Sequence, residues 1–113
     1  MKKLIIGLTI ATLAFTSCSK CDNEAPNARV VNDGTESVSV QIQTSGGNTV
    51  NINNIAAGTS SDFVSYASGT VMFTISVGKK DYEKTVNMEN CYQYDIKIDA
   101  NNNITSVPTN LND

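Results

Sequence analysis

Beyond its first segment, the chain alternates short runs of apolar and β-branched residues with clusters of Gly, Asn, Asp and Ser. Within the runs, apolar residues occupy every second position, which is typical of a strand with one buried face and one solvated face. The clearest examples are residues 37–43 and 70–77. Because no sustained 3.6-residue period follows the first segment, the sequence predicts an all-β domain.

Eight runs are predicted to be strands, each bounded by turn-forming residues: 28–31, 37–43, 49–55, 60–66, 70–77, 82–88, 90–99 and 104–107. Run 70–77 is the most regular and is expected at the centre of a sheet. Run 82–88 carries Lys84 among its inward positions, so we expect it at an edge. A turn is expected at residues 32–34, and Pro108 should end the last strand. The side chains predicted to form the core come from four runs: Val38, Val40, Ile42, Val71, Phe73, Ile75, Tyr94 and Ile96.

Short antiparallel strands, seven or eight in number and spaced about ten residues apart, predict an immunoglobulin-like β-sandwich, with a small β-barrel as the alternative. The chain has no Trp, so the tryptophan of true immunoglobulin domains is missing. The domain is predicted to span residues 28–108. A flexible polar tether at 18–27 would precede it, and a tail at 109–113 would follow it.

The first segment has the order of an export signal: two lysines, about a dozen mostly apolar residues, then two small residues before Cys18. This apolar stretch is shorter than the roughly 20 residues that a spanning helix needs. Residues 15–18, Phe-Thr-Ser-Cys, resemble the lipobox of bacterial lipoproteins, in which Leu usually stands at the first position. The resemblance implies that a signal helix at 1–17 is cleaved, that Cys18 carries acyl chains such as palmitate, and that the protein is anchored in the outer membrane of a Gram-negative cell. The alternative is an ordinary cleaved signal that leaves Cys18 as a thiol, and Cys21 is a poorer acylation candidate because Lys20 precedes it.

Three short stretches of the predicted domain also resemble uncharacterised envelope lipoprotein domains of the sandwich type. They are residues 28–32 (ARVVN), 58–63 (GTSSDF) and 67–70 (ASGT). This resemblance implies a sandwich fold, and it brings no catalytic residues to carry over.

The net charge and the absence of histidine argue against two classes of function, nucleic-acid binding and histidine-dependent catalysis. Removing 17 of the 113 residues, two lysines among them, leaves 96 residues and moves the formal charge from -3 to -5. This acidic balance argues against nucleic acid, which requires clustered Lys and Arg. The chain has no histidine, which excludes Ser/His/Asp and Cys/His triads and most general-base schemes near neutral pH.

Two partial motifs are better explained as strands and turns. Residues 76–79 match the S-x-x-K spacing of some serine enzymes, but the partner motifs of those enzymes are missing. Asp99, Asn101 and Asn103 imitate the first ligands of a calcium loop, whereas the Gly and the Glu that complete it are absent. We therefore expect no catalytic residue, no cofactor and no metal site.

These observations predict a non-enzymatic, lipid-anchored envelope module that binds a protein or glycan partner of unknown identity or gives structural support. One alternative is an envelope inhibitor of an enzyme such as lysozyme, because a small acidic lipoprotein suits a basic enzyme. That family's S-G-x-x-Y element is incomplete, since Ser68 and Gly69 are followed at the Tyr position by Met72. A second is a glycan-binding lipoprotein, for which Tyr66 and Tyr92 are the nearest stacking rings, although both are expected in the core. An enzyme that uses carboxylates and serine alone is the remaining class.

Cys21 and Cys91 remain once Cys18 is lipidated, in a compartment where disulfides persist. If Tyr92 and Tyr94 point inward, alternation turns Cys91 outward, where Cys21 of the tether can reach it. A bridge between Cys21 and Cys91 would close a loop of about 70 residues, which contributes roughly 4 kcal/mol to the free energy of unfolding in the chain-entropy model. A bridge within one molecule, two free thiols and a bridge between two molecules all stay open.

Overall fold

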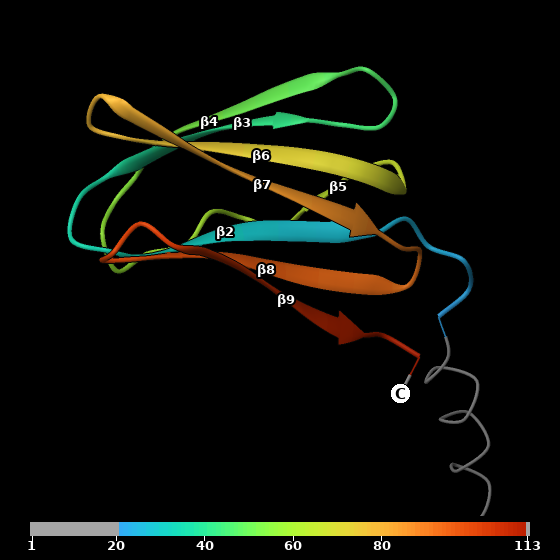
Figure 1. Cartoon of the computed structure of the whole chain (residues 1–113). Helices are drawn as coiled ribbons and strands as arrows, with labels where there is room; N and C mark the ends of the chain where they lie inside the picture. Colours follow the sequence, from blue (N-terminus) through green and yellow to red (C-terminus); the bar gives the residue numbers. More distant parts are fainter. Residues whose placement is uncertain (1–20, 113) are drawn as a thin grey trace, which may run out of the picture.

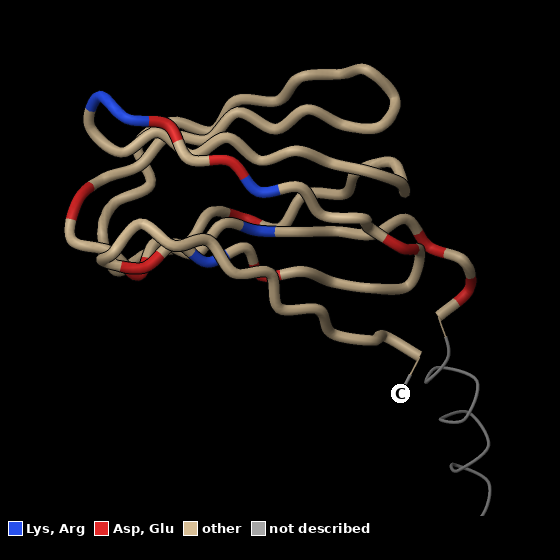
Figure 2. Tube along the Cα trace, viewed as in Figure 1, with Lys and Arg blue, Asp and Glu red and all other residues tan. Residues whose placement is uncertain are grey.

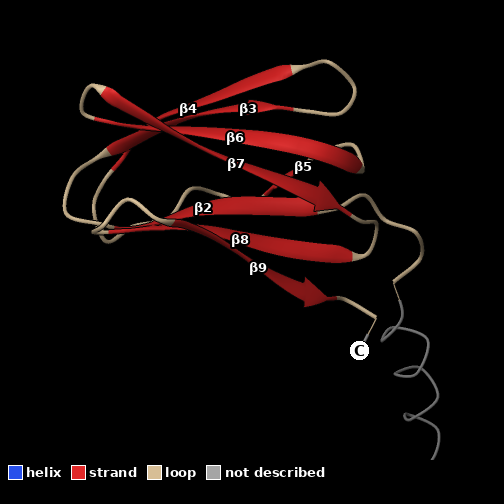
Figure 3. Cartoon of the chain, in the orientation of Figure 1, coloured by secondary structure: helices blue, strands red, loops and turns tan. Residues whose placement is uncertain are grey.

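The computed structural model describes residues 21–112 of the chain. The predicted signal helix and Cys18 lie outside these residues. Within them the chain forms strands and no helix (Figures 1 and 3). In chain order the strands are β2 (Asn27–Asp33), β3 (Val38–Gln43), β4 (Thr49–Ile55), β5 (Val64–Ser65), β6 (Gly69–Val77), β7 (Lys80–Met88), β8 (Tyr92–Asp99) and β9 (Ile104–Asn110).

The strands build two four-stranded sheets that pack face to face (Figure 1). One sheet has the order β4-β3-β6-β7 and the other the order β5-β2-β8-β9. The buried apolar side chains of both sheets form one cluster between them. The predicted β-sandwich is therefore confirmed, and the small barrel is not formed because the two sheets remain separate.

One strand pair departs from the predicted antiparallel arrangement. β2 runs parallel to β8, with Asn27 opposite Gln93 at one end and Asp33 opposite Asp99 at the other. Parallel neighbours need a long crossover connection, and here strands β3 to β7 supply it. Alternation of apolar and polar residues carries no information on strand direction, so the prediction of a wholly antiparallel domain is wrong for this pair.

The core follows the alternation in the sequence. All eight side chains predicted to be buried are at most 4% exposed. β6 lies between β3 and β7, and Val71, Phe73 and Ile75 of β6 are completely buried. Opposite them, Tyr94 and Ile96 of β8 belong to the same cluster. β7 lies at the edge of its sheet, as the half-buried Lys84 predicts.

Three predicted strand boundaries are wrong. The expected turn at 32–34 begins too early, because Asn32 lies inside β2 and is 0% exposed. The expected strand 60–66 is reduced to β5 and a single bridge between Ser60 and Val31. β9 continues through Pro108 to Asn110, since an edge strand pairs on only one side and tolerates a residue without an N–H.

The predicted flexible tether packs against the sandwich from Glu24 onward. Pro26 is fully buried, and its carbonyl accepts a hydrogen bond of 3.0 Å from the N–H of Tyr66. The carbonyl of Glu24 accepts one of 2.9 Å from the N–H of Cys91. These hydrogen bonds attach residues 24–26 of the predicted tether to the sandwich.

The turns gather at the two ends of the sandwich (Figure 1). We call one the terminal end, because the first and last described residues lie there; it comprises residues 21–26, 44–48, 66–68, 89–91 and 111–112. The opposite, distal end comprises residues 34–37, 56–59, 78–79 and 100–103.

Candidate functional site

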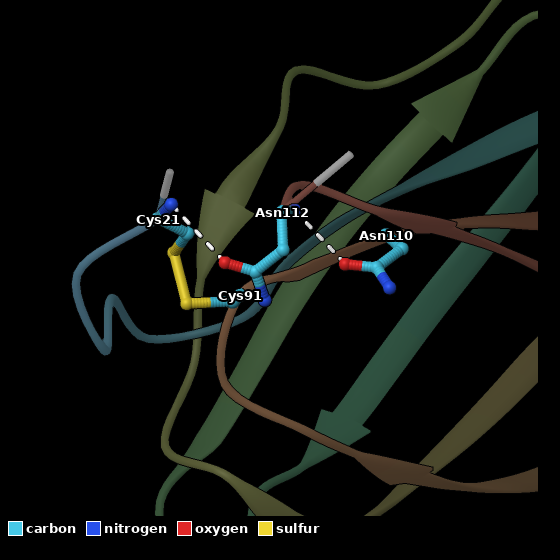
Figure 4. Close-up of a disulfide and its surroundings, with 4 residues drawn as sticks. All are labelled: Cys21, Cys91, Asn110 and Asn112. Atoms are coloured by element: carbon cyan, nitrogen blue, oxygen red, sulfur yellow. Dashed lines mark hydrogen bonds between the residues drawn. A yellow bond between two sulfur atoms is a disulfide. The ribbon is translucent and has the colours of Figure 1, made fainter. Parts of the chain in front are cut away.

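A disulfide joins the start of the described chain to the sandwich at its terminal end. The bond links Cys21 to Cys91 across 70 positions of sequence, with 5.7 Å between the two Cα atoms (Figure 4). This separation lies in the ordinary range for disulfides. Of the three states that the sequence leaves open, the bridge within one molecule is confirmed.

Cys91 does not point outward as the alternation rule predicts. It is 6% exposed and precedes β8 at the tip of the turn from β7. Its φ of 65° is in the left-handed region, so the two-residue period of β8 does not extend back to it. Tyr94 is buried as expected, and the half-buried ring of Tyr92 stacks on it with 6.1 Å between the ring centroids.

Hydrogen bonds surround the disulfide and include the other end of the chain. The N–H of Cys21 donates to the side-chain oxygen Oδ1 of Asn112 at 3.1 Å, and the N–H of Asn112 donates to Oδ1 of Asn110 at 2.9 Å (Figure 4). The N–H of Leu111 donates to the carbonyl of Cys91 at 2.9 Å. We call this group the terminal clasp: Cys21, Glu24, Cys91, Asn110, Leu111 and Asn112. It fixes residue 21 and the end of β9 to the same turn.

At the distal end, the buried side chain of Asn32 holds three segments together. Its Nδ2 donates to the carbonyls of Glu36 at 2.7 Å and Ile55 at 2.9 Å. Its Oδ1 accepts from the N–H of Gly34 at 3.0 Å. Its backbone N–H donates to the carbonyl of Thr59 at 2.9 Å. One amide thus satisfies two carbonyls and one N–H from other parts of the chain, which explains why a polar residue is buried here.

A hollow opens beside Asn32 at the same end. It encloses about 290 Å³, part of it open to solvent. Its lining combines backbone and side chains of the 32–38 turn, the end of β6 and the β8–β9 turn, with Glu36 and Asp99 as its acidic members. The lining of the hollow is mostly polar.

The calcium-loop candidates form a self-contained turn at the rim of this hollow. Oδ1 of Asp99 accepts from the N–H of Asn101 at 2.9 Å and from the N–H of Asn103 at 3.0 Å. This carboxylate therefore caps the β8–β9 turn, which is the ordinary role of Asp in such a position. Among residues 21–112, no three His, Cys, Asp or Glu side chains gather as a metal ion requires.

The S-x-x-K residues lie on the hairpin between β6 and β7. The hydroxyl of Ser76 donates to the carboxylate of Asp81 at 2.6 Å across this hairpin. Both side chains are on the outer surface of the sheet, and Lys79 is in the turn. The motif is thus a strand followed by a turn, without the helix that its enzymatic counterparts require.

A row of side chains that the sequence did not single out crosses the outer face of the sheet β5-β2-β8-β9. Arg29 of β2 pairs with the carboxylate of Asp95 of β8 through two hydrogen bonds, of 3.0 and 3.3 Å. The guanidinium also lies 4.8 Å from the ring centroid of Phe63. Val107 of β9 is opposite Asp95, and Phe63 and Val107 are each 41% exposed. We call Phe63, Arg29, Asp95 and Val107 the outer row.

The electrostatics of the outer row favour a fixed ion pair. The hydrogen bond from Arg29 to Asp95 raises the pKa of the guanidinium above its ordinary value, so Arg29 stays charged. The signal for this pair was present in the sequence as opposite charges at outward positions of two strands. It was missed because the parallel pairing of β2 and β8 was not predicted.

The residues considered for rival functions take structural positions. Tyr66 is buried and Tyr92 packs against the core, so neither presents an open ring on which a sugar can stack. Gly69 begins β6 with φ 117°, and the carbonyl of Ser68 accepts a hydrogen bond of 2.7 Å from the hydroxyl of Ser45. Ser68 and Gly69 therefore join a loop to a strand.

Comparisons with protein-family models, with curated proteins and with solved structures find no match to this chain. The case for a function therefore depends on the residues and the geometry described above. No helix in residues 21–112 combines the length and the apolar character needed to cross a bilayer.

Proposed function

We propose that the protein is a non-enzymatic module of the Gram-negative cell envelope, anchored in the outer membrane by acyl chains on Cys18, which acts by binding or by structural support. The observation that carries this proposal is the terminal clasp. It fixes Cys21 to the sandwich by a disulfide and by a hydrogen bond to Asn112. Only three peptide steps separate Cys21 from the proposed anchor residue.

The terminal clasp leaves only a short peptide link between the proposed anchor residue Cys18 and the sandwich. Each extended residue spans at most about 3.6 Å, so the Cα of Cys18 can lie no more than about 11 Å from the Cα of Cys21. The terminal end would thus be held next to the bilayer, with almost no free linker. Acyl chains contribute about 0.8 kcal/mol per buried CH₂, so two or three chains would keep the domain on the membrane.

The outer row supports a protein as the partner rather than a glycan. Aromatic residues and Arg are enriched at protein surfaces that bind other proteins, and the outer row contains Phe63 and Arg29. The ring of Phe63 already has the Arg29 guanidinium over one face, which leaves less of it for a sugar. The acidic charge favours a basic partner through electrostatic steering, as in the inhibitor alternative.

The test of the proposal is the chemistry of the mature N-terminus. Mass spectrometry should find a diacyl or triacyl mass on Cys18, and Cys18→Ala should move the protein from the membrane fraction to the soluble fraction. Ser17→Ala is the matched control, because a small residue is retained before the cysteine and anchoring should persist. Recovery of an unmodified wild-type chain in the soluble fraction would contradict the proposal.

A further inference from the structure

The open edges of the two sheets differ in how they are protected. In the described part of the chain the edge strands are β4, β7, β5 and β9. β7 alternates charges of both signs, β5 has only two residues, and β9 contains Pro108. Each of these features discourages pairing with another chain. β4 has none of them, because it is seven residues long and contains no proline, and Figure 2 shows no charged residue on it.

The stretch of β4 that can pair further is five residues long. The register between β3 and β4 shifts between Val38 and Val40, which is the mark of a bulge, and Asn54 has a φ of 57°. This bulge interrupts the regular edge after Asn53. The loop from β3 ends at Asn48, where β4 begins. β4 pairs with β3 in one register from Thr49 to Ile52, and Asn53 precedes the left-handed Asn54, so the open edge comprises residues 49–53.

The side chains of this edge are only partly covered. Val50 and Ile52 face the core and pack against it, yet both stay half-buried because no further strand covers them. Thr49, Asn51 and Asn53 are exposed on the other face. A strand added beside β4 would cover Val50 and Ile52 if it carried apolar residues two positions apart.

The sequence of β4 supplies this pattern itself. In an antiparallel pair with its two-fold axis beside Asn51, Asn51 meets its own copy, Val50 meets Ile52, and Thr49 meets Asn53. This register pairs apolar with apolar and polar with polar over all five residues. A shift by one residue would place apolar side chains opposite polar ones.

Shifting the register between the two copies of β4 by more than one residue is also less favourable. A shift of the pairing by two positions would bring either the loop residue Asn48 or the bulge residue Asn54 into the ladder. The register centred on Asn51 is therefore favoured, and like every antiparallel pairing of identical strands it closes a two-fold dimer.

We propose that the β4 edge is a self-association site, through which two copies of the chain join their β4-β3-β6-β7 sheets into one eight-stranded sheet. Pairing adds a second ladder to β4, covers Val50 and Ile52, and brings no like charges together. This inference does not depend on the lipid anchor. Because the paired strands run in opposite directions, the two terminal ends would lie at opposite ends of the dimer, so copies anchored in one bilayer would pair with their strands along its surface.

The oligomeric state of the chain from Ser19 onward, which contains the whole described fold, tests the proposal. Sedimentation analysis should show a concentration-dependent dimer. Asn51→Lys places two like charges beside the two-fold axis and should abolish the dimer, whereas Asn87→Lys on the opposite edge strand should leave it intact. Circular dichroism shows whether both variants remain folded. A wild-type chain that stays monomeric up to about 1 mM overturns the proposal.

Cysteine cross-linking tests the register. Directly opposite Cα atoms in an antiparallel pair lie about 4.5 to 5.5 Å apart, within the span of a disulfide. Asn51→Cys should therefore give a covalent dimer on mild oxidation, while the native cysteines stay bonded to each other. Asn53→Cys is the matched control, because residue 53 is opposite Thr49 and should not cross-link. A dimer that cross-links equally through residue 53 overturns the proposed register.

Discussion

The two ends of the sandwich are held together by different chemistry. At the terminal end a covalent bond joins residues 70 positions apart, and hydrogen bonds add the last strand. At the distal end a single buried amide, that of Asn32, connects the β2–β3 turn to the end of β4. The first arrangement restricts the unfolded chain as well as the folded one, whereas the second acts only in the folded state.

The contrast between a disulfide at one end and a buried amide at the other predicts that the two ends respond differently to mutation. The disulfide should make the terminal end the more resistant of the two to opening, which would suit a surface held next to the proposed anchor. The distal end depends on polar partners that assemble only when three segments are in place, and its hollow is open to solvent. Removing the features of each end in turn should therefore have different consequences.

The largest effect is expected from removing the disulfide. In the chain from Ser19 onward, the double variant Cys21→Ser, Cys91→Ser should lower the free energy of unfolding by about 4 kcal/mol, because a loop of 70 residues is no longer closed in the unfolded state. Urea denaturation measures this loss. Asn112→Ala, which removes only the exposed hydrogen bond to Cys21, is the control and should cost about 1 kcal/mol or less. A loss under about 1 kcal/mol in the double variant would show that the clasp does not stabilise the terminal end.

A smaller but still large effect is expected at the distal end. Asn32→Ala leaves the carbonyls of Glu36 and Ile55 and the N–H of Gly34 without their partner, so the free energy of unfolding should fall by about 2 to 3 kcal/mol. Asn101→Ala is the control, because its side chain is exposed in a turn and the change should stay within about 0.5 kcal/mol.

Hydrogen exchange locates this second effect. Amide protection should fall around the 55–59 segment in Asn32→Ala and stay unchanged around Cys91. A uniform loss of protection at both ends would contradict the separation between them.

The sequence predicts the class of fold and the core because both depend on burial, and burial imposes a two-residue period on each strand. Phe73 and Ile96 could be assigned from this period alone. The parallel pairing of β2 and β8 could not, since side-chain alternation is the same in either direction. Asn32 was assigned to a turn because Asn-Asp-Gly is typical of turns, whereas its burial depends on the carbonyl of Ile55, which only the folded chain brings near.

For the candidate site, counting cysteines predicts the disulfide but not its surroundings. Cys91 has a left-handed conformation and is 6% exposed, whereas a continuation of the strand alternation would place it on the outer face. The hydrogen bond from Cys21 to Asn112 joins segments 91 positions apart, which no local pattern specifies. The outer row could not be predicted for the same reason, because it depends on the relative positions of β2, β8, β9 and the segment before β5.

The smallest effect is a pH dependence that should separate the two ends. Burial raises the pKa of Tyr66 and of Tyr94 above the ordinary value of about 10. Tyr66 is at the terminal end, and the hydroxyl of Tyr94 accepts a hydrogen bond from the N–H of Glu89 there. The side chain of Asn32 at the distal end does not titrate.

In the unfolded chain both phenols ionise near pH 10, whereas in the folded chain they ionise only at higher pH. Their contribution to stability is therefore complete below about pH 10 and is lost as the pH rises through the raised folded values. Tyr66→Phe removes one of these groups, so the free energy of unfolding should fall less steeply above about pH 10 than in the wild type. Urea denaturation at a series of pH values measures both slopes, and the same comparison at pH 7 shows the change in packing alone. If hydrogen exchange above pH 10 increased first around Asn32, the alkaline loss would begin at the distal end, and the assignment of this pH dependence to the buried tyrosines would be wrong.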